Sequence, residues 1–122
     1  MTYRLASTLT GTLAAQLCLC LLVVPDLVHW LFALTPGDAS EVIGRRAAML
    51  FAGVAVVLFL TRDHPPSPTR RAIGWGVVAM MGGLAAIGMV EFWRGLVGPG
   101  IGVAIVTELA VVFAFVRANA RS

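Results

Sequence analysis

The sequence predicts an all-α integral membrane protein, a four-helix bundle, and three observations support this. Hydrophobic residues make up 59% of the 122-residue chain, charged residues make up only 12%, and the mean hydropathy is +0.92. A soluble domain of this composition would leave too much apolar surface in water. The apolar residues also fall into long uncharged runs, and the chain has room for at most about four spans of about 20 residues. Finally, its basic residues are nine arginines and no lysine, and they cluster where helices are expected to end. We therefore expect residues 1–122 to form one transmembrane domain.

The first span is predicted over residues 5–24, a run of twenty uncharged residues. This run is long enough to cross a bilayer, and it exceeds the roughly 7 to 15 apolar residues of a signal-peptide core. We therefore expect an uncleaved first helix.

Pro25 interrupts this helix, because proline lacks a backbone donor and disfavours helical geometry in the residue before it. Residues 26–34 are then expected to form an interfacial extension. Its apolar side chains share one face, while Asp26 and His29, three residues apart, share the other. An indole at Trp30, just after the first span, suits the membrane interface.

The second helix is predicted over residues 39–61. Only the fourteen residues 47–60 are free of charge, and as a helix they cover about 21 Å, less than the roughly 30 Å hydrocarbon core. Arg45 and Arg46 are therefore expected to lie at or inside the membrane boundary, where each needs a partner.

The remaining helices are predicted over residues 72–94 and 101–116. The linker 62–71 contains three prolines, and we expect it to be a hydrophilic loop without regular structure. In the third helix small residues recur at a spacing of four, as at Ala79 and Gly83, which lets another helix approach closely.

Arginines are distributed six to one side of this topology and three to the other. The positive-inside rule then places both termini and the linker in the cytoplasm. The six arginines on the cytoplasmic side are Arg4, Arg62, Arg70, Arg71, Arg117 and Arg121.

The outer side collects side chains of both signs in one layer. Such groups are costly to bury singly, so they are expected to pair. One interpretation is an ion-pair network that sets helix register; the other is a vestibule in which an arginine holds an anionic group while Asp26 and His29 handle a proton. The layer consists of Asp26, His29, Asp38, Glu41, Arg45, Arg46, Glu91 and Arg94.

Glu108 lies seven residues into the fourth helix, about 10 Å from the outer end. A charged carboxylate is unfavourable at this depth, so we expect Glu108 to face the interior and to be protonated or paired. It is interpreted either as a neutral acid hydrogen-bonded to Gln16 or to a threonine of the first helix, or as a site of proton-coupled function.

Motifs for catalysis are absent from the sequence: it has no HExxH, GxSxG or phosphate-binding loop. No cofactor or metal is expected, because His29 and His64 fall on opposite sides of the membrane, and Cys18 and Cys20 point in different directions along one helix. No basic stripe interleaves with exposed aromatic residues, so nucleic acid is not an expected partner.

The order of features resembles small four-helix bacterial inner-membrane proteins of the DoxX-like type. These features are the PDL at residues 25–27, RRAAMLFAG at 45–53, the arginine-rich loop, and RRAI at 70–73. The resemblance implies a four-helix bundle and an accessory or redox-associated role, with no catalytic residue to carry over. Small multidrug transporters have a similar length, but they depend on a glutamate in the first span, which is uncharged here.

We therefore expect a non-enzymatic membrane protein, an accessory or interaction subunit of a larger assembly. Its expected partners are membrane lipids and other membrane subunits or further copies of itself. The alternative is a binder or transporter of a small lipophilic or anionic molecule that uses the outer charged layer and Glu108.

Overall fold

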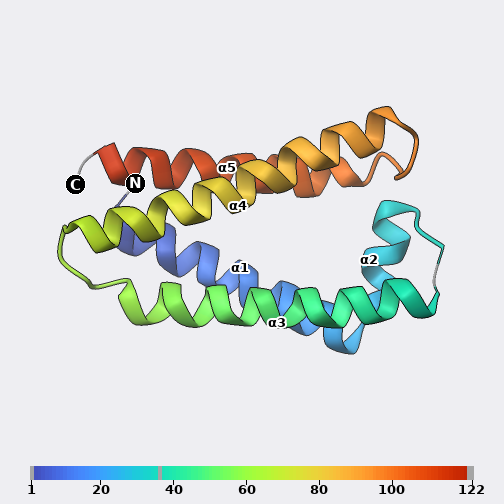
Figure 1. Ribbon diagram of the computed structural model, residues 1–122, viewed down its shortest axis with the longest axis horizontal. Helices are drawn as coiled ribbons and strands as arrows, with labels where there is room; N and C mark the ends of the chain where they lie inside the picture. Colours follow the sequence, from blue (N-terminus) through green and yellow to red (C-terminus); the bar gives the residue numbers. More distant parts are fainter. Residues whose placement is uncertain (1, 36, 121–122) are drawn as a thin grey trace.

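A computed structural model of the protein describes residues 2–35 and 37–120, with the side chains of residues 38, 39 and 41 outside that description. It contains five helices and, over these residues, no strand, which confirms the all-α prediction (Figure 1). The helices are α1 (Tyr3–Val23), α2 (Pro25–Phe32), α3 (Asp38–Thr61), α4 (Pro68–Trp93) and α5 (Ile101–Ala120).

Four of the helices, all except α2, are long and apolar enough to cross a membrane. Within each spanning segment at most 28% of the residues are buried inside the molecule. The remaining apolar surface needs an apolar surrounding, because a soluble monomer does not expose continuous patches of this size. The chain is thus a multi-pass membrane protein by the length and composition of its helices.

The linker prediction was wrong at its C-terminal end, because α4 begins at Pro68, inside the segment expected to lack regular structure. Ser67 is the N-cap, and its Oγ accepts a hydrogen bond from the backbone N–H of Arg70 at 3.1 Å. Proline at the first helical position is favourable, because its missing donor has no partner there in any helix. Two of the three prolines thus precede the helix, and the third starts it.

The long helices form two antiparallel pairs, α1 with α3 and α4 with α5. The pairs meet at the end of the molecule where both termini lie, and they diverge towards the other end (Figure 1). At the meeting point the buried rings of Tyr3 and Phe115 pack edge to face with centroids 6.0 Å apart. Leu58 and Met81 bring α3 and α4 into the same core.

Helix α2 lies between the two pairs at the end where they diverge (Figure 1). The backbone N–H of Gly98, in the connection between α4 and α5, donates to the carbonyl oxygen of Phe32 at 2.8 Å. A Cβ atom on Gly100 would overlap the carbonyl oxygen of Leu31, so only glycine allows this approach. The α4–α5 connection therefore holds α2 in the gap.

Candidate ligand cavity and charged ends

A cavity of about 350 Å³ lies between the diverging helix pairs. All five helices line it, and α2 contributes Val28, Leu31 and Phe32. The other walls are mostly aliphatic and aromatic, and they include Leu13, Phe51, Met81 and Leu84. Its volume falls within the roughly 300 to 1,000 Å³ that is usual for pockets that bind small molecules.

Glu108 is the only charged residue that lines this cavity within the described ranges. Its Oε2 atom is enclosed by protein and has no hydrogen-bond partner among the described residues. The neighbouring hydroxyl of Thr107 cannot serve, because it donates to the carbonyl oxygen of Val103 in its own helix at 2.8 Å. An enclosed polar atom without a partner costs about 1 to 3 kcal/mol, which a bound hydrogen-bond donor would offset.

The expected hydrogen bond from the first helix to Glu108 is not formed in the part of the chain that the structure describes. Gln16 is exposed on α1. Thr8 and Thr12 donate to backbone carbonyl oxygens one turn earlier, each at 2.8 Å. Helix α1 instead presents Leu13 and Leu17 to the cavity, so the surroundings of the carboxyl group are more apolar than expected.

The residues of the predicted outer layer lie near the end of the molecule where α2 is found, on α2, at the start of α3 and at the end of α4 (Figure 1). His29 is buried, and its Nδ1 lies 4.0 Å from Oδ1 of Asp26, whose side chain is 87% exposed. Over the described residues, no ion pair within 4 Å involves Arg46, Glu91 or Arg94.

Arg45, Arg46 and Arg94 are exposed, and Glu91 is half-buried. The side chains of Asp38 and Glu41 lie outside the described residues. The residues of the outer layer thus lie at the same end of the protein, and their role as an ion-pair network or a vestibule stays a prediction.

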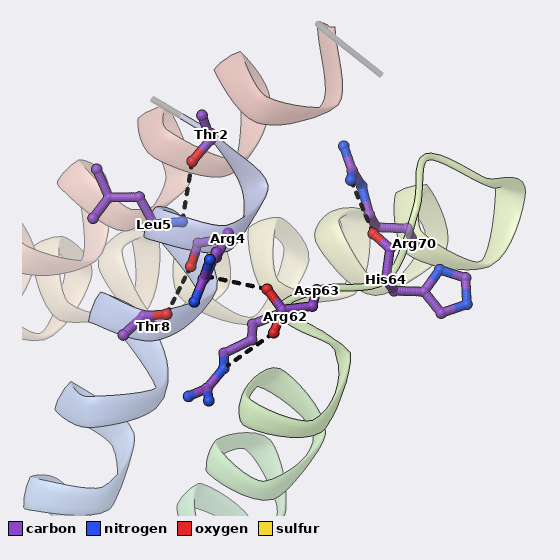
Figure 2. A network of polar contacts seen from close by, with 8 residues as sticks. All are labelled: Thr2, Arg4, Leu5, Thr8, Arg62, Asp63, His64 and Arg70. Carbon is purple, nitrogen blue, oxygen red and sulfur yellow. Dashed lines mark hydrogen bonds and ion pairs between the residues drawn. The ribbon is translucent and has the colours of Figure 1, made fainter.

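Two close ion pairs lie at the other end, where the arginine pattern predicted only the orientation of the chain. Nε of Arg4 lies 3.1 Å from Oδ1 of Asp63, and Nε of Arg62 lies 3.7 Å from Oδ2 of the same residue (Figure 2). Arg4 is in the first turn of α1 and Asp63 follows α3, so no spacing rule could have joined them.

No group of three or more histidine, cysteine, aspartate or glutamate residues that could hold a metal occurs in the described part of the chain. His29 is on α2, and His64 follows α3 at the far end of the molecule (Figure 1). Cys18 and Cys20 are free thiols.

Comparison with known proteins gives little further guidance. No family model matches the chain, and no solved structure matches it. A 56-residue stretch is 39% identical to part of pyochelin synthetase PchF of Pseudomonas aeruginosa (strain UCBPP-PA14). This stretch covers 44% of the chain but only 3% of the synthetase, so the chain matches a small fraction of that protein.

Proposed function

We propose that this protein binds a small lipophilic molecule in the cavity between its helix pairs, without catalysing a reaction on it. The observation that carries the proposal is an apolar cavity of about 350 Å³ whose single enclosed carboxyl oxygen, on Glu108, lacks a partner. Ligand pockets are typically apolar with a few polar groups that orient the ligand.

The lining narrows the class of ligand. Within the described residues no arginine or histidine side chain lines this cavity, so an anion would have no counter-charge there and would face the Glu108 carboxyl group. A neutral molecule or an amine with one hydroxyl or N–H group fits better, because it would donate a hydrogen bond to Oε2. Of the two ligand classes suggested by the sequence, lipophilic and anionic, we therefore favour a lipophilic molecule.

The proposal places the protein in a bacterial inner membrane, with both termini in the cytoplasm and the α2 end on the outer side. The cytoplasmic position of both termini is supported by the arginine distribution. A ligand then enters the cavity from the outer half of the bilayer, where the helix pairs diverge.

Filling the cavity tests the proposal. Ala104 lines the cavity on α5, and Ala104→Phe would occupy it, whereas Ala86 is exposed on α4 and Ala86→Phe is the matched control. The protein is purified in mild detergent, and small molecules extracted from it are identified by mass spectrometry. We expect a lipophilic compound with the natural protein and Ala86→Phe, and its loss with Ala104→Phe. Equal retention by both variants would contradict the cavity as the site.

Glu108→Gln tests the role of the carboxyl group. Glutamine keeps the size of the side chain, but it replaces one carboxyl oxygen with an NH2 group that cannot accept a hydrogen bond, so we expect roughly tenfold weaker binding of the extracted compound. Titration of that compound into the purified variant measures this change. Unchanged affinity would show that Glu108 does not contact the ligand.

A second candidate, an accessory subunit of a membrane assembly, is favoured by a different observation. An apolar groove of about 380 Å³ runs between α3 and α4, and Gly53 and Gly76 line it. Small residues allow a helix of another subunit to come close. An accessory subunit keeps its protein partner on co-purification after Ala104→Phe, whereas the ligand-binding proposal expects that variant to lose the small molecule.

A further inference from the structure

A second pocket, of about 420 Å³, opens at the end of the molecule where both termini lie. It is formed by the start of α1 and the connection between α3 and α4 (Figure 2). Among the described residues, three arginines, Arg4, Arg62 and Arg70, line it together with one carboxylate, Asp63. The formal charge of these four side chains is +2, from three positive and one negative.

Asp63 holds two of the guanidinium groups next to each other. Both Arg4 and Arg62 contact it through Nε, at 3.1 Å and 3.7 Å. A guanidinium has five N–H donors, and only one of them is on Nε, the atom through which each of these two arginines contacts Asp63; the other four are on the terminal nitrogens. Two adjacent guanidinium groups with terminal donors are well suited to the oxygens of a phosphate.

The third arginine is held in place by the fold. Nη1 of Arg70 donates to the backbone carbonyl oxygen of His64 at 3.0 Å, and its guanidinium carbon lies 4.7 Å from the centre of the Tyr3 ring. Tyr3 is itself buried, with its hydroxyl 3.2 Å from Oγ1 of Thr61. Because α1, α3 and α4 all contribute to these contacts, the positive wall of the pocket forms only when the helices are packed.

We propose that this pocket binds a phosphate group, carried either by the head group of an anionic phospholipid or by a soluble phosphate ester. The pocket lies at the ends of membrane-spanning helices, at the level of the lipid head groups, and basic pockets between such helices bind anionic lipid head groups. The site is separate from the Glu108 cavity, and it does not depend on a ligand in that cavity.

The test measures binding of phosphatidylglycerol and of phosphatidylcholine to the full-length protein in detergent by native mass spectrometry. We expect the anionic lipid to bind more tightly. The double variant Arg4→Gln/Arg62→Gln should bind it about tenfold to thirtyfold more weakly, because each arginine near a membrane surface contributes roughly a fivefold factor. Arg71→Gln/Arg117→Gln is the matched control, because these exposed arginines are at the same end but do not line the pocket.

A second variant, Asp63→Asn, tests the same pocket through an expected gain in lipid affinity, which misfolding of the variant could not produce. It removes the negative charge of Asp63 but keeps an amide oxygen that can accept from an arginine Nε in the same place, so we expect the affinity for phosphatidylglycerol to rise several-fold. An equal loss in the control variant, no loss in the double variant, or unchanged or weaker binding by Asp63→Asn would each overturn the proposal.

Competition by inorganic phosphate then distinguishes the two sources of the phosphate group. Displacement of the lipid by inorganic phosphate supports a soluble phosphate ester. Failure to displace it supports the phospholipid, whose acyl chains contribute to binding.

Discussion

At the scale of single residues, glycine positions decide how closely α2 can approach the α4–α5 connection. Gly98 and Gly100 both lie against the C-terminal end of α2, and a Cβ on Gly98 would come within 2.8 Å of the Cβ of Ala33. Gly102 follows in α5, and a Cβ there would meet nothing within 4 Å. Gly98 and Gly100 therefore allow the approach of α2 and Gly102 does not, a difference that the sequence pattern alone could not reveal.

We predict that Gly100→Ala destabilises the protein by about 1 to 3 kcal/mol, because the added methyl group overlaps the Leu31 carbonyl oxygen and displaces backbone. Gly102→Ala is the control, and it should stabilise the protein by roughly 0.5 to 1 kcal/mol, because alanine is the better helix former. Thermal unfolding in detergent measures both. A Gly100→Ala protein as stable as Gly102→Ala would contradict the docking of α2 seen here.

At the scale of helices, the ends depend on local hydrogen bonds more than on hydropathy. Helix α4 begins four residues before its predicted start because Ser67 caps it. Helix α5 continues four residues past its predicted end, to Ala120, and Asn119 is buried there against α4, with its Nδ2 donating to the carbonyl oxygen of Arg71 at 3.4 Å. Hydropathy located these helices, but it could not locate their ends, because the end residues are polar.

We predict that Ser67→Ala costs about 0.5 to 2 kcal/mol, because the backbone N–H of Arg70 loses its acceptor. Hydrogen exchange at the first amides of α4 should accelerate, and thermal unfolding in detergent should occur at a lower temperature. Ser67→Asp keeps an acceptor at the N-cap and should preserve both measurements. Slow exchange in Ser67→Ala would mean that the prolines alone start the helix.

At the scale of the whole molecule, the two ends differ in chemistry. The end with α2 exposes Trp30 and Trp93, at 77% and 91%, and indoles of this kind gather at the head-group level of a bilayer. The opposite end carries the arginine pocket and the pairs that Asp63 makes. The larger number of arginines at the end with the pocket accords with the proposed orientation, in which that end faces the cytoplasm.

We predict that single cysteines report this orientation once Cys18→Ala and Cys20→Ala have removed the natural thiols. In intact cells a membrane-impermeant maleimide should label Gly37→Cys, between α2 and α3, and should not label Pro66→Cys, between α3 and α4. Labelling of Pro66→Cys requires permeabilised cells. The reverse pattern would invert the proposed orientation, and it would leave the helix packing unchanged.

The sequence by itself determined the helical class, the number of membrane-length helices and their approximate positions, because long apolar runs are a local property of the chain. The tertiary structure alone decided which faces turn inwards. Leu58 is 1% exposed and Leu60 is 81% exposed, although they are two residues apart in the same apolar run. Lipid tails are as apolar as a leucine side chain, so hydropathy cannot tell a core position from a lipid-facing one. The cavity around Glu108 and the pairing of Arg4 with Asp63 became visible only once the helices were packed together.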